Sequence, residues 1–319
     1  MIQVQNVQQQ PSQDVREQLY SQLEDYLGLS STKKKMDSSE KSGGTTLKRK
    51  SSEQSSSSSS SKALSKNTLA IKVNGKTIKG SAQNIVGRVV EAEMGASFSQ
   101  EALKAQAVAA YTYIRYNNQK GTIPSLPAKS SVSAKVEDAV EQVIGEALYY
   151  QGEYINATYC ASNAGNSVDS ENVWGGYLPY LRSVESPSDT TLKAYGAVKR
   201  FSEEEIAQYI EDNLDVDPYD YSDPDEWFED EEYINGRYVD SIRVCGRRLS
   251  GREVREELME FALPSAAFEV EYDDGEFIFT TYGYGHGVGM SQQGADYFAQ
   301  RGWDYEEILT HYYTGVTLK

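Results

Sequence analysis

A change of composition near residue 67 limits how much of this chain can fold around an apolar core. Residues 37–66 are rich in Ser, Lys and Gly and include seven consecutive serines, Ser55–Ser61. Such a segment has almost nothing apolar to bury, so its composition predicts a flexible, disordered linker. The folded part of the 319-residue chain is therefore expected in residues 67–319, which we interpret as one domain.

Residues 1–36, ahead of the linker, contain one short amphipathic pattern. The apolar residues Val15, Leu19, Leu23 and Leu27 recur at helical spacing, which predicts a single helix with one apolar stripe. The first residues lack the basic and then apolar plan of a signal peptide, and no run of about 18 apolar residues occurs. We therefore expect neither an export signal nor a transmembrane segment in this chain.

The net charge of −17 narrows the classes of partner. Nucleic-acid binding depends on a basic surface for phosphates, so nucleic acid is not expected as a partner.

Between Glu203 and Glu232 the chain has 15 acidic residues and no Lys or Arg. We interpret residues 203–235 as a solvated acidic insertion. A calcium site is the less favoured alternative, because the spacing and central glycine of an EF-hand loop are absent.

Strand and helix patterns are interspersed from residue 69 onward without regular strand-helix-strand units, which predicts an α+β fold. Residues 97–121 predict a long helix that begins with a capping box of Ser97 and Gln100 and ends at Gly121. One or two further helices are predicted near the C-terminus. Turn signals predict hairpins around Asn74-Gly75, Gln151-Gly152 and Asp273-Asp274-Gly275.

The segment "GYGHGVGMSQQGA", residues 283–295, is a candidate binding loop. It lacks the Lys of a P-loop, the spacing of a dinucleotide-binding loop and the GxSxG of a nucleophile elbow. Its glycines would let the main chain approach a ligand closely. The hydrogen-bonding groups that it offers are those of His286, Ser291, Gln292 and Gln293. The alternative is a structural turn whose histidine is satisfied within the protein.

Two glutamates, Glu91 and Glu93, lie in the largely apolar stretch "VVEAEMGASF". Apolar surroundings disfavour the carboxylate anion and raise the pKa, so such a carboxyl can hold a proton near neutral pH. That property suits a general acid. The alternative is that each glutamate is an exposed residue on a half-buried strand.

Four stretches in this order are similar to the stage II sporulation protein D family, from about Leu69 to Lys319. They are "VVEAEMGASFSQEALKAQAVAAYTYI", "GEALYYQGEYINATYCASNAGNSVDSENVWGGYLPYL", "LSGREVREEL" and "YGHGVGMSQQGADYFAQRGWDYEEILTHYYTGV". The resemblance implies a peptidoglycan lytic transglycosylase. Such an enzyme cleaves the MurNAc-GlcNAc bonds of denuded glycan strands and leaves 1,6-anhydroMurNAc ends.

The same resemblance implies a role and a place in the cell. The family remodels the cell wall during engulfment in sporulation, on glycan that a partner amidase of the stage II sporulation protein P type has stripped of peptides. It acts outside the cytoplasm, at the cell wall or septal membrane. The expected partners of this chain are therefore peptidoglycan glycan strands and an amidase.

The family's catalytic glutamate directly precedes Met in the "EM" pair, which implies Glu93 here. Ordinary glycosidases need two carboxyl groups. A lytic transglycosylase uses the C6 hydroxyl of MurNAc as its own nucleophile, so a single carboxyl can serve as acid and then base. His286, Ser291, Gln292 and Gln293 would bind substrate in a central cleft. Ser162 and Trp174 would form its opposite wall.

The chain departs from the family pattern at several positions. Gly95 stands where Pro usually follows the "EM" pair, and Tyr111 replaces an arginine. Some relatives bind zinc near the loop that matches "TYCASNAG". This chain has Cys160 there but no histidine before His286, so no metal and no other cofactor is expected.

Two other classes of function stay open. One is a non-catalytic peptidoglycan-binding module or amidase activator, a role that relatives with this domain also have. The other is a structural adaptor of the cell wall that uses residues 1–66.

Overall fold

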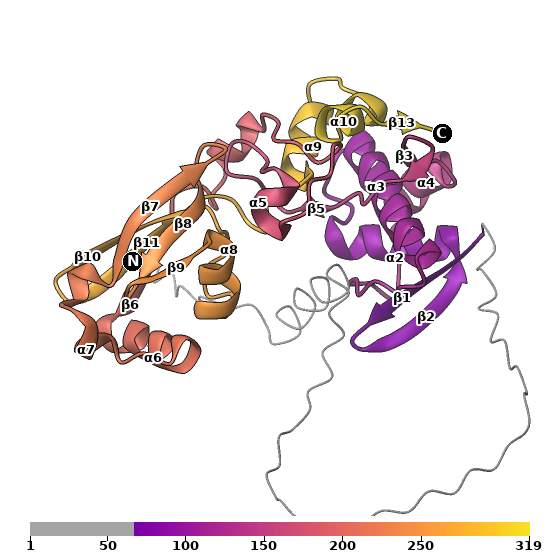
Figure 1. Cartoon of the computed structure of the whole chain (residues 1–319). Coiled ribbons are helices and arrows are strands. Elements are labelled where there is room, and N and C mark those ends of the chain that lie inside the picture. The colour runs from indigo at the N-terminus through magenta and orange to yellow at the C-terminus, as the bar shows by residue number, and fades with distance from the viewer. Residues whose placement is uncertain (1–66) are drawn as a thin grey trace, which may run out of the picture.

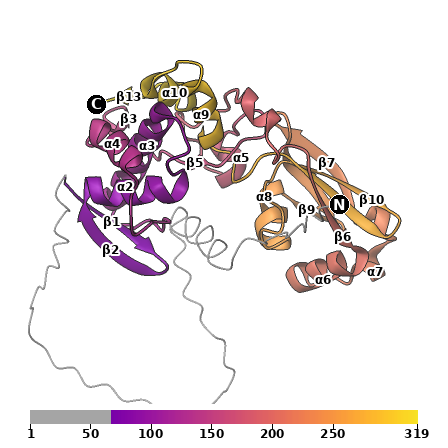
Figure 2. The same cartoon turned by 180° about the vertical axis from the view of Figure 1, so that it is seen from behind.

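In a computed structural model of the chain, residues 67–319 are described, and the helix predicted in residues 1–36 and the linker predicted at 37–66 lie outside them. Helices and strands are interspersed along the described residues, which confirms the α+β prediction. The buried apolar side chains form two separate clusters. Figures 1 and 2 show the corresponding two lobes side by side.

The first lobe joins the beginning and the end of the described chain. Strands β1 (Thr68–Val73) and β2 (Lys76–Ser81) form the predicted hairpin, with Asn74 and Gly75 at φ 47° and 72°. The helices of this lobe are α2 (Ala82–Glu93), α3 (Gln100–Gln119), α4 (Ala134–Val143), α9 (Gln292–Ala299) and α10 (Tyr305–Tyr312). Helix α3 lies at the centre, in contact with the other four (Figure 1). The prediction of one or two helices near the C-terminus is thereby confirmed, with two present.

Helix α3 begins later than its sequence pattern predicts. Ser99 is its N-cap, and the predicted capping box of Ser97 and Gln100 is wrong. The Ser99 N–H donates to Asp296 Oδ1 of α9 at 2.6 Å, so a carboxylate from the far end of the chain satisfies this amide. The end at Gly121, with φ 82°, is as predicted.

The second lobe, residues 197–281, is built on two three-stranded sheets. One sheet has the order β10 (Phe268–Asp273), β11 (Glu276–Thr281), β6 (Ala197–Ser202), and its β10-β11 hairpin was predicted. The other has the order β7 (Phe228–Ile234), β8 (Tyr238–Val244), β9 (Arg247–Leu249). Trp227 stacks on Phe277 with ring centroids 5.4 Å apart, so the two sheets share one aromatic core.

The acidic segment 203–235 is an integral part of this second core. Helix α6 (Glu203–Leu214) buries Ile206 and Ile210, and its acidic residues Glu204 and Glu205 are exposed. The segment also contains the short helices α7 (Pro218–Tyr221) and η2 (Pro224–Glu226) and strand β7. Its charges therefore cover a packed lobe.

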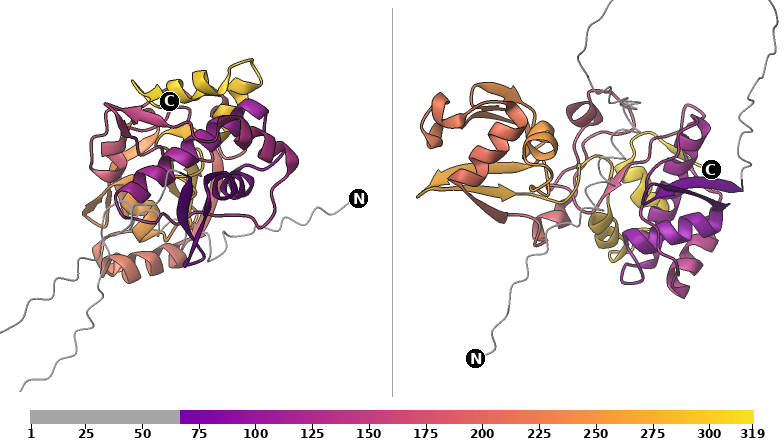
Figure 3. Two further views of the ribbon diagram at one scale, coloured as in Figure 1. Left: turned by 90° about the vertical axis from the view of Figure 1, so that its right-hand side faces the viewer. Right: turned by 90° about the horizontal axis from the view of Figure 1, so that it is seen from below.

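Irregular segments and short elements connect the lobes (Figure 3). Strand β5 (Tyr159–Cys160) pairs in parallel with β12 (Met290–Ser291), and β3 (Leu148–Tyr150) pairs with β4 (Glu153–Tyr154) as predicted. The remaining elements are α5 (Ser170–Trp174), η1 (Pro187–Thr191), α8 (Gly251–Glu253), η3 (Val254–Leu258) and β13 (Thr317–Leu318). Among residues 67–319, no helix combines the length and apolar character needed to cross a bilayer.

Candidate active site

Glu93 is the last residue of helix α2, where the chain turns out of the helix. The N–H groups of Met94 and Gly95 both donate to the Val90 carbonyl, at 2.9 and 3.2 Å. Gly95 has φ 73°, a left-handed conformation that proline cannot adopt because its ring fixes φ near about −65°. The conformation of this helix end therefore requires Gly95 in place of the proline that is usual in the family. The alternative of a half-buried strand for this stretch is wrong, since Val86, Val89 and Val90 are buried at helical spacing.

The two neighbouring glutamates have different partners. Glu91 Oε2 accepts hydrogen bonds from the Ser133 hydroxyl at 2.7 Å and the Ser133 N–H at 3.0 Å, at the start of α4. Glu93 Oε2 accepts one from Gln292 Nε2, the first residue of α9, at 3.2 Å. Residues two apart on a helix point in different directions, so only Glu93 faces the glycine-rich loop.

The environment of Glu93 raises its pKa from 4.5 to about 7. The main cause is burial, which disfavours the anion, and the hydrogen bond from Gln292 opposes it only in part. Some of the Glu93 surface is still accessible to solvent, although protein atoms surround the carboxyl closely. A carboxyl with this pKa is present as both acid and anion near neutral pH, which suits a group that donates and then accepts a proton.

The glycines of the loop at 283–289 make room for the protein's own atoms. Gly283, Gly285, Gly287 and Gly289 all have positive φ. A Cβ on Gly289 would lie 2.2 Å from the Thr158 carbonyl oxygen, and the other three would meet protein atoms at 2.2 to 2.7 Å. Glycine is therefore required at these four positions by packing within the protein, whereas the sequence suggested clearance for a ligand.

His286 and Trp174 lie together beside this loop. Their ring centroids are 5.1 Å apart. The Val288 N–H donates to His286 Nδ1 at 3.0 Å, which leaves the ring proton on Nε2 in the neutral imidazole. Burial and then the positive charge of Arg255 lower the His286 pKa to about 4. The imidazole is thus neutral at pH 7 and is a weak base.

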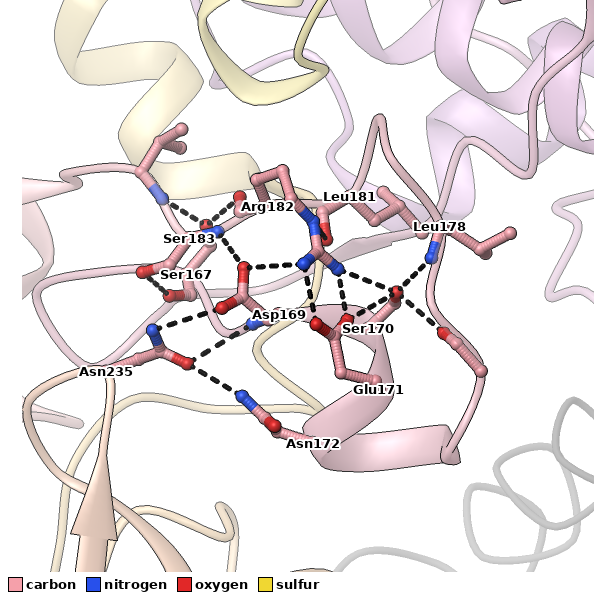
Figure 4. A network of polar contacts seen from close by, with 12 residues as sticks. Ser167, Asp169, Ser170, Glu171, Asn172, Leu178, Leu181, Arg182, Ser183 and Asn235 are labelled. Atoms are coloured by element: carbon pink, nitrogen blue, oxygen red, sulfur yellow. Dashed lines mark hydrogen bonds and ion pairs between the residues drawn. The ribbon is translucent and has the colours of Figure 1, made fainter.

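The network in Figure 4 fixes the helix that carries Trp174. Arg182 Nη1 donates to Glu171 Oε1 at 2.7 Å, and the same guanidinium lies 3.6 Å from Asp169 Oδ1. Asn235, in the turn between β7 and β8, accepts from Asn172 Nδ2 at 3.1 Å. Helix α5 is therefore attached to the second lobe.

Ser291 has a structural role. Its hydroxyl is fully buried, donates to Asp189 Oδ1 at 3.0 Å and accepts from the Gly294 N–H at 2.9 Å as the N-cap of α9. The Asp189 carboxylate also accepts from the Asn163 N–H and the Ser186 hydroxyl, each at 2.8 Å. Asp189 could not be recognised from the sequence, because an aspartate in a Ser-, Pro- and Thr-rich stretch is typical of an exposed turn.

The remaining predicted residues lie along the edge between β5 and the loop. Ser162 is buried and exchanges two main-chain hydrogen bonds with Tyr284, at 3.0 and 3.1 Å. The Gln293 N–H donates to the Ala161 carbonyl at 3.1 Å, and its side chain is half-buried. Tyr159, which the sequence did not indicate, connects the two sides. Its main chain bonds His286, and burial and then the charge of Glu93 raise its pKa.

Cys160 is a buried free thiol whose Sγ–H donates to Asn163 Oδ1 at 3.0 Å. Burial raises the Cys160 pKa to about 12, so the thiol stays protonated. Within residues 67–319 there is no cluster of three or more His, Cys, Asp or Glu side chains with the geometry to hold a metal ion.

Comparisons with known proteins find similarity to bacterial sporulation proteins. The family model described as Stage II sporulation protein matches residues 79–150, which include Glu93. Stage II sporulation protein D of Bacillus amyloliquefaciens is 32% identical, over 76% of this chain and 77% of the relative. The protein of the same name from Bacillus subtilis has the same identity and coverage. The amidase enhancer of Bacillus subtilis is 28% identical, over 72% of this chain and 39% of its own length.

Proposed function

This chain belongs to the stage II sporulation protein D family of sporulation proteins, and on that premise we propose that it is a peptidoglycan lytic transglycosylase. Its substrate would be denuded glycan strands, cleaved between MurNAc and GlcNAc to give 1,6-anhydroMurNAc ends. The observation that carries the proposal is the carboxyl of Glu93, with a pKa of about 7 and one amide partner.

In the proposed reaction Glu93 acts twice. The protonated carboxyl donates to the glycosidic oxygen as the bond from that oxygen to C1 of MurNAc breaks. The C6 hydroxyl of the same sugar then forms a bond to C1, and the Glu93 carboxylate takes the hydroxyl proton. No water is consumed, and the enzyme returns to its starting protonation state. Because nucleophile and electrophile belong to one sugar, a second carboxyl is unnecessary.

The other groups of the site have supporting roles in this proposal. Gln292 donates to Glu93 and limits how far burial raises its pKa. Neutral His286, whose ring is tilted against that of Trp174, and the Gln293 side chain would contact sugar in a cleft between α2 and the loop. We leave Ser291 out of the substrate-binding set, because both of its hydrogen-bonding roles are already used inside the protein.

The test compares two neighbouring glutamates. Full-length protein, Glu93→Gln and Glu91→Gln are incubated with denuded glycan strands, and anhydroMurNAc ends are counted by mass spectrometry. Loss of a general acid costs about 10²- to 10⁴-fold in rate, so Glu93→Gln should be nearly inactive. Glu91→Gln should keep most of the activity, because its carboxyl only holds the start of α4. Equal losses in both variants would refute the assignment.

An amidase activator is the second candidate, and the similarity to an amidase enhancer favours it. In that case the chain would stimulate a stage II sporulation protein P-type amidase on intact peptidoglycan, outside the cytoplasm at the cell wall or septal membrane. Stimulation that is the same with Glu93→Gln, without anhydroMurNAc ends from the wild type, would support the activator and exclude the enzyme.

A further inference from the structure

A cavity of about 650 Å³ lies between the connecting segment 164–195 and the second lobe, apart from Glu93. Its volume falls within the range of about 300–1,000 Å³ that is usual for small-molecule sites, which are frequent at such boundaries. None of Glu93, Gln292, His286 and Trp174 lines it. The lining residues with polar or aromatic side chains include Asn166, Glu185, Tyr195, Tyr233, Arg237 and Glu269.

The guanidinium of Arg237 is held rigidly in one wall. Its Nε donates to the Tyr195 hydroxyl at 2.9 Å, and its Nη1 donates to Glu269 Oε1 at 2.7 Å. The same group lies over the Tyr282 ring, 4.2 Å from its centroid. Because the Tyr195 oxygen accepts from Arg237, its own O–H is left to donate to a ligand.

Tyr233 gives the cavity an accessible aromatic face. It lies near the end of β7 and 45% of its surface is exposed. An aromatic ring that is apolar on its face and polar at its tip suits a sugar, whose rings have apolar faces and polar edges. The carboxylates of Glu185 and Glu269 outnumber the one guanidinium, so the wall chemistry favours a neutral sugar over a phosphate or a carboxylate.

Two structural links join this cavity to the candidate active site. Asn235, next to Gly236 of the lining, binds the helix that ends at Trp174 (Figure 4). The other link is the segment that continues from Ser162, which pairs with the glycine-rich loop, to Asn166 in the cavity wall. The two sites are therefore connected through contacts of the same short segments.

We propose that this cavity is a second saccharide-binding site, which holds a neutral GlcNAc unit of the same glycan strand at a distance from the cleaved bond. This inference rests on the proposed function, since the strand is its ligand. Binding at two places on one strand raises the effective concentration of the strand at Glu93. Long strands would thus be bound more tightly than fragments that reach Glu93 alone.

The experiment measures binding in the full chain with Glu93→Gln, so that the strand stays intact. Isothermal titration calorimetry with long denuded glycan strands compares Tyr233→Ala with Tyr221→Ala on that background. Tyr221 is a matched control in the same lobe, with 44% of its surface exposed, and does not line the cavity. We expect Tyr233→Ala to weaken binding about tenfold and Tyr221→Ala to leave it within about twofold.

One further variant distinguishes loss of the saccharide-binding site from loss of the fold. Tyr233→Phe keeps the ring and should bind within about threefold of the parent. Equal affinity of Tyr233→Ala and Tyr221→Ala would overturn the second site even if cleavage at Glu93 occurs. If the wild type makes no anhydroMurNAc ends but Tyr233→Ala still binds weakly, the proposed enzyme activity fails and the saccharide site stands.

Discussion

Two opposing influences act on the carboxyl of Glu93. Burial disfavours its anion, and the amide of Gln292 favours it, with a resulting pKa of about 7. At neutral pH the free energies of the two protonation states are then nearly equal. A group poised in this way can give up a proton and take one back at small cost in each direction. Glu91, two residues earlier, accepts a hydrogen bond from the Ser133 hydroxyl at 2.7 Å, at the start of α4.

The raised pKa of Glu93 should appear in the stability of the protein. In the unfolded chain this carboxyl ionises near 4.5, and in the folded protein near 7. Between pH 4.5 and pH 7 the folded state keeps this proton and the unfolded chain does not. The contribution of Glu93 to the free energy of unfolding is therefore complete below pH 4.5 and is lost as the pH rises through 7. Glu93→Gln cannot ionise. Its melting temperature should exceed that of the wild type by about 2–4 °C at pH 8 and by much less at pH 5.

Thermal unfolding at the two pH values checks this prediction, with Glu91→Gln as the control. Glu91→Gln should be less stable than the wild type at both pH values, because it disturbs the bonds to Ser133. A difference for Glu93→Gln that does not change with pH would contradict the assigned pKa.

At the scale of elements, the glycine-rich loop is shaped by its close contact with residues 158–163, around β5, and with Tyr238 of β8. Its glycines alternate with larger residues, and each has a positive φ where a side chain would meet the neighbouring segment. This packing fixes where α9 begins and hence where Gln292 meets Glu93. The geometry of the site therefore depends on main-chain contacts between distant segments.

Gly289→Ala tests this requirement against a matched control. Its Cβ would lie 2.2 Å from the Thr158 carbonyl oxygen, at φ 79°. Gly275 has φ 85° with open space around it, so Gly275→Ala has the conformational strain without the clash. Urea unfolding should show Gly289→Ala destabilised by about 2–4 kcal/mol and Gly275→Ala by about 1 kcal/mol. Equal losses would mean that packing does not require glycine there.

The elements that could be predicted from sequence are those whose signals are local. The hairpins at Asn74-Gly75 and Asp274-Gly275 depend on turn residues with positive φ, which the sequence names directly. The N-cap of α3 could not be predicted, because its amide partner, Asp296, belongs to the last part of the chain. The helix that carries Glu93 was also ambiguous, since a short apolar run suits a strand as well.

The candidate site was predictable in part. The assignment of Glu93 and its placement with Gln292 and His286 came from the resemblance, and their roles in catalysis stay a proposal. Asp189 could not be found, because its significance comes from burial beside Ser291, which only the folded chain creates.

At the scale of the whole molecule, two apolar cores are joined by polar contacts. Asn235 of the second lobe accepts from Asn172 of α5, and Arg182 ties the same helix to the intervening loop. The helix ends at Trp174, beside His286. The second lobe thus contributes to the candidate site by holding α5 in place, although Glu93 belongs to the first lobe.

Asn235→Gly should remove the bonds between α5 and the second lobe without changing the turn. Asn235 has φ 47°, which glycine adopts freely. Asn74→Gly is the control, because Asn74 also has φ 47° but lies in an isolated hairpin turn. Cleavage of denuded strands should fall about tenfold in Asn235→Gly, since Trp174 is less well positioned. A steady-state assay in which both variants match the wild type would contradict the coupling.

The central claim is that the C6 hydroxyl of MurNAc, not water, replaces the leaving group under the control of Glu93. The measurement that tests it most directly is cleavage of denuded strands in ¹⁸O-labelled water, followed by mass spectrometry of the new ends. We predict 1,6-anhydroMurNAc ends without ¹⁸O, formed by the wild type and nearly absent with Glu93→Gln. Reducing ends that contain ¹⁸O would show hydrolysis and would contradict the account.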